Sequence, residues 1–169
     1  MWSSATSSVV EFDMESETIK ICSHPEIQGK YIEMVKVEDK YCLIPANKES
    51  KLVVLSEKYE QLYTIDIPKG EYDFGISYLR GINVNAMLWM FPGTAEYPLA
   101  VDLNTKQVKR MVDFEAETMS KELLETGAWK FFFAQKKENC IYAHNQYSGE
   151  LMIYNYKEQA MIKKQVKVE

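Results

Sequence analysis

The sequence predicts an all-β fold in which a four-stranded antiparallel unit is repeated along the chain. The chain is 46% hydrophobic and has eleven Tyr and seven Phe, a composition that favours packed strands over disorder. A pattern of apolar strand, loop, strand, tight polar turn and strand recurs in it. The strands are apolar on both sides, so each predicted sheet needs cover on both faces.

The clearest copy of the repeat lies in the middle of the chain. An apolar strand at Leu88–Pro92 precedes a loop and a second strand at Leu99–Asp102. A polar turn at Asn104–Lys106 then leads to a third strand at Val108–Met111. A further strand, Ile76–Val84, follows a glycine and precedes the other three, which completes a four-stranded unit.

The remaining units follow the same order of elements. Apolar strands like Leu88–Pro92 recur at Tyr41–Pro45 and Cys140–His144, which places Pro45, Pro92 and His144 at one position of the repeat. The units are about 45 residues long, a length typical of repeat architectures. Their boundaries are 1–28, 29–70, 71–114 and 127–169.

One segment, 115–126, does not fit the repeat and predicts a short helix. Acidic Glu115 and Glu117 lie near its start, apolar Met119 and Leu123 share a face, and Gly127 can cap its end. We therefore expect a single domain over 1–169 with about three and a half to four units and one helical insertion.

The repeat resembles that of bacterial β-propeller proteins, without pointing to a subfamily. The resemblance rests on an aromatic-x-x-Pro strand at Trp89–Pro92 and on the L-x-x-D-L-x-T sequence at Leu99–Thr105. It implies four-stranded blades packed side by side around a central channel. The Gly-Gly pair of kelch repeats and the Trp-Asp ending of WD40 blades are missing, and the resemblance transfers no active site.

The number of units raises the question of how a ring would close. Met1 and Trp2 already stand where a second strand should run, and a closed ring usually has four to eight blades. Three arrangements remain open: part of a longer protein, a small self-closed ring, or a ring that two copies complete. Because apolar faces need cover, we favour a partial propeller over a self-closed monomer. A β-sandwich or a single barrel would show similar patterning.

Charge and composition narrow the classes of partner. The net charge of -5 argues against nucleic-acid binding, and no apolar run is long enough to span a membrane. The N-terminus lacks the features of a secretory signal. Three widely spaced cysteines, Cys22, Cys42 and Cys140, predict buried free thiols and a reducing, cytoplasmic location.

Two groups of residues are candidates for a ligand site. The first lies on the rim, the side that holds the loops after the second strands and the links between units: His144, with Tyr31, Tyr78 and Trp129 at the mouths of the inner strands. These aromatic side chains could equally pack between blades. The second is the pair Glu33 and Arg80, aligned on adjacent inner strands with Phe132 third. This pair either faces the channel and binds a polar ligand or ties two blades together.

The chain shows no catalytic, cofactor or metal motif. Gly75-Ile76-Ser77 lacks the second glycine of a nucleophile elbow, and His144 has no partner at metal-ligand spacing. We therefore expect a non-enzymatic binding module for a protein, peptide or glycan. The alternatives are a propeller hydrolase or lyase with His144 as general base, and a partial propeller completed by self-association into a homo-oligomer.

Overall fold

The computed structural model describes residues 1–3, 6–27, 29–47, 49–68, 76–95, 97–111, 114 and 130–166. These residues form fifteen strands, arranged as four antiparallel sheets that follow one another along the chain. The prediction of an all-β fold built from repeated antiparallel sheets is confirmed. The expected helix at 115–126 lies outside the described residues.

Sheets A and B are formed by the first half of the chain. Sheet A has three strands, β1 (Trp2–Ser3), β2 (Ser8–Asp13) and β3 (Thr18–Ser23). Sheet B has four, which are β4 (Tyr31–Val37), β5 (Lys40–Pro45), β6 (Leu52–Leu55) and β7 (Gln61–Ile65).

Sheets C and D are four-stranded and repeat the order of sheet B. Sheet C contains β8 (Tyr78–Val84), β9 (Met87–Pro92), β10 (Leu99–Asp102) and β11 (Val108–Arg110). Sheet D contains β12 (Phe131–Lys137), β13 (Cys140–Asn145), β14 (Glu150–Asn155) and β15 (Ala160–Gln165).

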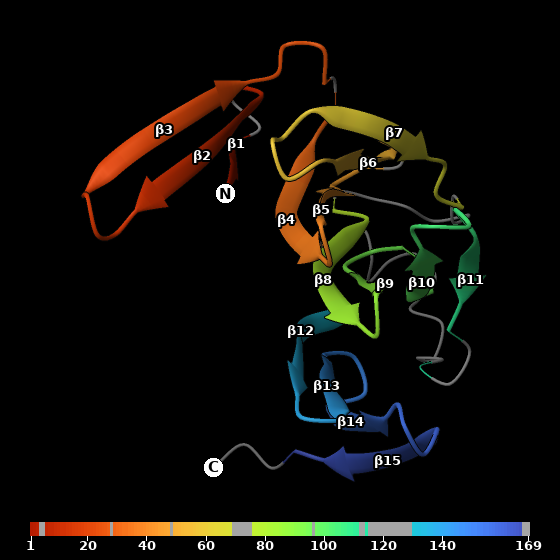
Figure 1. Cartoon of the computed structure of the whole chain (residues 1–169). Coiled ribbons are helices and arrows are strands. Elements are labelled where there is room, and N and C mark those ends of the chain that lie inside the picture. Colours follow the sequence, from red (N-terminus) through yellow and green to blue (C-terminus); the bar gives the residue numbers. More distant parts are fainter. Residues whose placement is uncertain are drawn as a thin grey trace.

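The sheets are arranged as an arc, with sheets A and D at its two ends (Figure 1). Strands β4, β8 and β12 follow one another along the inner side of the arc, whereas β7, β11 and β15 lie on its outer side. Each inner strand contacts the next, β4 with β8 and β8 with β12. In sheet A the described residues provide no strand that matches β4, β8 and β12.

The strand register shows how the units correspond and corrects one alignment. Tyr31 opposes Pro45 and Tyr78 opposes Pro92, whereas Phe131 opposes Asn145. Asn145, not His144, therefore occupies the proline position. The sequence pattern places this position one residue too early, because the apolar run stops before the strand does.

The same register places His144 beside a different set of residues. His144 opposes Phe133, as Phe91 opposes Arg80 and as Ile44 opposes Glu33. Phe91 and Ile44 are fully buried between neighbouring sheets. His144 therefore occupies a position whose counterparts in sheets B and C face the sheet that follows.

Three apolar seams, one between each pair of neighbouring sheets, make up the core. In the seam between sheets A and B, Trp2 lies edge-on to Tyr31, with ring centroids 5.8 Å apart. The seam between sheets C and D is built around Phe91. Its ring centroid is 5.6 Å from that of Phe131 and 5.3 Å from that of Phe114. Sheets B and C share the third seam, which includes Ile44, Tyr78 and Met90. Strands that are apolar on both faces are thus covered on both faces in sheets B and C.

The outer hairpins of sheets A, C and D turn in a similar way. In sheet C the Asp102 carboxylate accepts hydrogen bonds from the amides of Asn104 and Thr105, at 2.8 and 3.1 Å, and Lys106 then takes a φ of 58°. Asp13 and Asn155 accept the corresponding bonds in sheets A and D. Such side-chain acceptors stabilise a turn without requiring glycine.

The cysteines are free, as the sequence predicts, but they differ in burial. Cys42 is fully buried in the seam between sheets B and C, and this burial raises the pKa of its thiol to about 12. Cys22 and Cys140 are only partly buried. Within the described part of the chain no helix has the length and apolar character needed to cross a membrane.

We expect Phe91→Ala to lower the free energy of unfolding by about 3–5 kcal/mol, because a fully buried aromatic ring is lost from the seam. Urea denaturation followed by circular dichroism measures the change. Leu62→Ala is the control, because Leu62 is 48% exposed. An equal loss in both variants would contradict the assignment of the core to the seams.

The turn in sheet C makes a further, pH-dependent contribution. The bonds from the Thr105 and Asn104 amides lower the pKa of the Asp102 carboxyl, so its stabilising effect is present above the unfolded pKa of about 3.9 and lost below it. Asp102→Asn keeps the acceptor oxygen but loses the charge. We expect the variant to be less stable than the parent at neutral pH and the difference to shrink as the pH falls below about 4. A difference that stays constant in urea denaturation across this range would contradict the turn's role.

Candidate functional site

A chain of backbone hydrogen bonds fixes the rim, where the inner strands begin and the second strands end. Each N–H group donates to the carbonyl of the preceding member, alternately within a sheet and across to its neighbour, at 2.7–3.0 Å. In order, the members are Lys30, Ala46, Ser77, Gly93, Lys130 and Gln146. The starts of β4, β8 and β12 are therefore held at fixed positions relative to one another.

A bulge near the start of each inner strand sets which side chains face the middle of the arc. The register shifts between Tyr31 and Glu33, between Tyr78 and Arg80, and between Phe131 and Phe133. Glu33, Arg80 and Phe133 consequently occupy matching positions. The expectation that Phe132 would be the third member was wrong, because the bulge in β12 takes up that residue.

These matching residues line one pocket, with a volume of about 320 Å³. It lies where the inner strands β4, β8 and β12 follow one another. The lining residues are Glu33, Arg80, Gly81, Ile82, Phe133, Ala134 and Gln135. The two charged residues predicted from the sequence are thus brought together with Phe133 and Gln135, which the sequence did not single out.

The Glu33 carboxylate anchors the polar side of this pocket. It accepts a hydrogen bond from Arg80 Nη1 at 3.2 Å and another from the Gly81 backbone N–H at 2.9 Å. This geometry depends on the close approach of β8 to sheet B. A Cβ atom at Gly81 would lie 2.8 Å from both Ile44 Cδ1 and Val35 Cγ2.

Arg80 is the group of this pocket that is best able to bind a ligand. Its side chain is 53% exposed, and one N–H group is used by Glu33. A guanidinium has five N–H donors, so Arg80 has more donors than the one that bonds Glu33. Phe133, which is 38% exposed, and Gln135 also line the pocket and add an apolar surface and a neutral hydrogen-bonding group.

The other predicted site residues lie elsewhere. Tyr78 is 4% exposed and packs in the seam between sheets B and C. His144 is half-buried on the face of sheet D that points away from sheet C. Trp129 lies outside the described residues. The structure therefore does not bring His144 together with Tyr31 and Tyr78.

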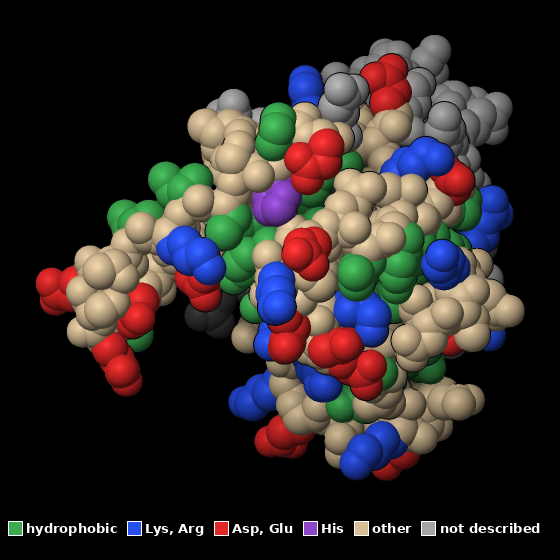
Figure 2. All heavy atoms as spheres, turned by 45° about the horizontal axis from the view of Figure 1, so that its top comes forward, with side chains coloured by type: hydrophobic (Ala, Val, Ile, Leu, Met, Phe, Trp, Pro, Cys, Tyr) green, Lys and Arg blue, Asp and Glu red, His purple; other side chains and the backbone are tan. Residues whose placement is uncertain are grey.

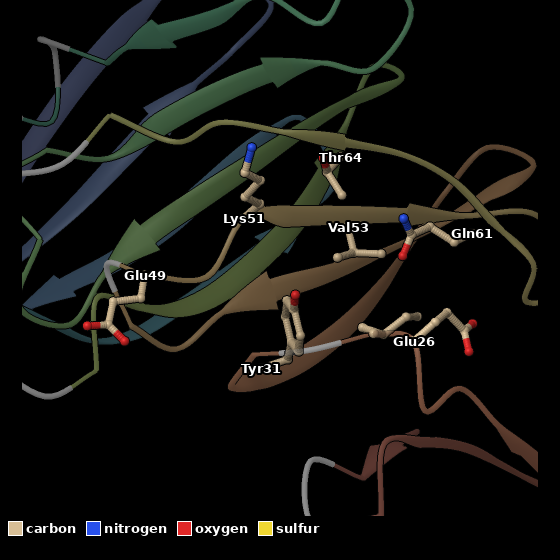
Figure 3. A pocket seen from close by; sticks show the side chains of 8 residues that line it. Glu26, Tyr31, Glu49, Lys51, Val53, Gln61 and Thr64 are labelled. Atoms are coloured by element: carbon tan, nitrogen blue, oxygen red, sulfur yellow. The ribbon is translucent and has the colours of Figure 1, made fainter.

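Tyr31 lines a second pocket, of about 300 Å³, beside the link between sheets A and B (Figure 3). Its ring points toward Val53 on β6, with Lys51 and Thr64 beyond. Tyr31 itself is 6% exposed, and burial raises the pKa of its hydroxyl. Sequence reasoning did not find this pocket, because its walls come from segments that only the seam brings together.

Next to this pocket, His24 and Glu26 form a polar corner. His24 Nδ1 is 3.1 Å from Glu26 Oε1, and the His24 and Trp2 rings are 6.3 Å apart. His24 Nε2 and Trp2 Nε1 are both buried, and neither has a hydrogen-bond partner among the described residues. No group of three or more His, Cys, Asp or Glu in the described chain is placed to hold a metal ion.

No protein-family profile and no curated protein matches the sequence. Among solved structures, the chain is similar to virginiamycin B lyase from Staphylococcus aureus, with a TM-score of 0.66 at 6% identity over 98% of this chain and 50% of that one. It is also similar to U3-55K, with a TM-score of 0.61 at 7% identity over 95% of this chain and 46% of that one.

A third similar structure is the extracellular domain of BT4673 from B. thetaiotaomicron, with a TM-score of 0.65 at 10% identity over 97% of this chain and 22% of that one. The chain thus spans half the length or less of each of these solved chains. At such low identity the likeness concerns the fold alone. It confirms a β-propeller-like fold and shows no specific subfamily.

We expect Gly81→Ala to destabilise the protein by about 1–3 kcal/mol, because the added Cβ overpacks the contact with Ile44 and Val35. Urea denaturation gives the change. Adding Val35→Ala removes one of the two methyl groups at 2.8 Å, so the double variant should lose less than the sum of the two single losses. Additive losses would show that the close approach of β8 does not limit this position.

Proposed function

We propose that this chain is a non-enzymatic binding module of the β-propeller type, and that its ligand occupies the pocket formed by Glu33, Arg80, Phe133 and Gln135. The observation that carries the proposal is the position and exposure of the Arg80 guanidinium. Its guanidinium is held in place by the Glu33 carboxylate on one side and remains half exposed toward the pocket on the other. Oriented donors next to an exposed ring are typical of ligand sites.

The chemistry of the pocket favours a ligand that carries a carboxylate. A guanidinium binds carboxylates through paired N–H donors, and its partner Glu33 fixes the orientation of that fork. The Phe133 ring can cover an apolar face of the ligand, and Gln135 can accept or donate one neutral hydrogen bond. A peptide or a glycan with a free carboxylate offers these groups together.

An enzymatic function with His144 as general base gains no support from the geometry. The half-buried His144 is paired with Phe133 on β12 and with Leu151 on β14. A general base needs a substrate within hydrogen-bond reach, and neither of these neighbours is a polar group that would hold one there. The similarity to a lyase concerns the fold. If any enzymatic activity were found, this proposal predicts that the His144→Ala variant keeps full turnover.

Titrations with matched probes test the binding proposal. We would follow amide chemical shifts with short peptides that end in a free carboxylate or in an amide, and with sialylated or neutral oligosaccharides. We expect the carboxylate form of one pair to bind, and Arg80→Ala to weaken that binding roughly 10- to 100-fold, since hydrogen bonds to charged groups contribute about 1.5–3 kcal/mol.

Two controls make this result specific. Lys36→Ala removes an exposed cation of the neighbouring strand β4. It should leave binding unchanged, because Lys36 pairs with Glu57 away from the pocket. Arg80→Lys keeps the charge but loses the fork and should restore binding only in part. Equal binding of the acid and amide forms, or an unchanged affinity in Arg80→Ala, would refute the proposal.

A further inference from the structure

Each end of the arc presents a sheet face that no other described sheet covers. On sheet D this face includes the paired residues Tyr142, Ile153 and Ile162, which lie side by side across β13, β14 and β15. On sheet A it includes the pairs Val10 with Ile21 and Phe12 with Ile19, across β2 and β3. Ile162 is 55% exposed and Ile21 is 65% exposed.

The open face of sheet D consists of positions that form a seam in the preceding sheet. Tyr142 and His144 match Trp89 and Phe91 in sheet C, since Gln135 and Phe133 oppose them as Ile82 and Arg80 oppose their counterparts. Trp89 and Phe91 are buried against sheet D. The open face therefore has the layout of a seam that lacks its second half.

Sheet A supplies the other half of such a seam. Val9 points toward sheet B and is fully buried there, and the alternation of side chains along β2 turns Val10 and Phe12 to the opposite side. In sheets B, C and D the corresponding side contacts the preceding sheet. Figure 2 shows the β2–β3 hairpin projecting from the body, with hydrophobic side chains along it and acidic side chains at its tip.

The charges of the two end sheets are complementary. Residues 8–23 of sheet A carry four acidic side chains and one lysine; Glu11 and Lys20 pair on the side that faces sheet B, and Glu15 and Glu17 lie in the turn at the hairpin tip. Residues 131–166 of sheet D carry five lysines and three glutamates, and Lys137 and Lys164 alternate onto its open side with Gln135 and Ile162. An exposed apolar face bordered by charges of opposite sign to those of its counterpart marks an interaction site.

We propose that a second copy of this chain covers these faces, with sheet A of each copy packed on sheet D of the other. Two identical seams around a two-fold axis would close a ring of eight sheets, within the usual range of four to eight. One chain covers 50% of virginiamycin B lyase, so two copies would together be about as long as that propeller-like chain. This inference is independent of the ligand proposed for Arg80.

The mass of the purified chain in solution tests the proposal. Size-exclusion chromatography with light scattering should give a closed dimer of about 39 kDa, twice the chain mass of 19.7 kDa, without further growth as the concentration rises. A monomer at all concentrations would overturn the proposal. Continuous growth into larger species would overturn the closed two-fold arrangement.

Two charged substitutions identify the surfaces. Ile21→Asp alters the face of sheet A and Ile162→Asp that of sheet D, both at exposed positions where folding should survive. Each variant alone should lose the dimer peak. The two variants mixed retain one intact pair of faces, and their mutual dissociation constant should be at least tenfold lower than that of either variant with itself.

Leu62→Asp is the matched control, because Leu62 is an exposed apolar residue on β7, away from both end faces. It should leave the dimer intact. Circular dichroism spectra like that of the parent chain show that each variant is folded. If only one of the two end-face variants lost the dimer, or if mixing brought no gain, sheet A would not pack on sheet D and the proposal would fail.

Discussion

The two middle sheets, B and C, depend on a neighbour on each side, because their strands are apolar on both faces. Isolated sheets with that pattern would expose two hydrophobic surfaces to water, and a neighbouring sheet on each side removes both from solvent. The seam is therefore the unit of stability, more than the sheet itself. Phe91 illustrates this role, since it is fully buried by Phe114 and Phe131, which lie outside its own sheet.

The seams also determine where polar chemistry is possible. Side chains on the sheet faces within the seams are used for packing, which leaves the inner edge, the links between sheets, the turns and the outer strands for charged groups. The ion pair of Glu33 and Arg80 lies at the inner edge. His24 and Glu26 lie in a link. Tyr31 and Tyr78 belong to the seams, which explains why aromatic residues at the mouths of inner strands are buried.

The sequence was sufficient to predict the strands, their order and the pairing of Glu33 with Arg80, because apolar runs, turn residues and repeat length are local signals. It was not sufficient to predict register. The bulges at Ile32, Leu79 and Phe132 add a residue without any compositional sign, and they make Phe133 the residue whose position in the register matches Glu33 and Arg80. The position of His144 was misassigned by one residue for a related reason, since strand pairing continues to Asn145.

The chain of backbone hydrogen bonds along the rim has a consequence for motion. Loops are usually the parts of a protein that open most easily. Here the residue after each second strand, such as Ala46 or Gly93, is bonded both within its own sheet and to the next one. Opening a rim loop near the inner edge therefore requires hydrogen bonds of two sheets to break together. We expect local opening to be confined to the outer strands. A ligand at the inner edge would then bind to a surface that needs no rearrangement.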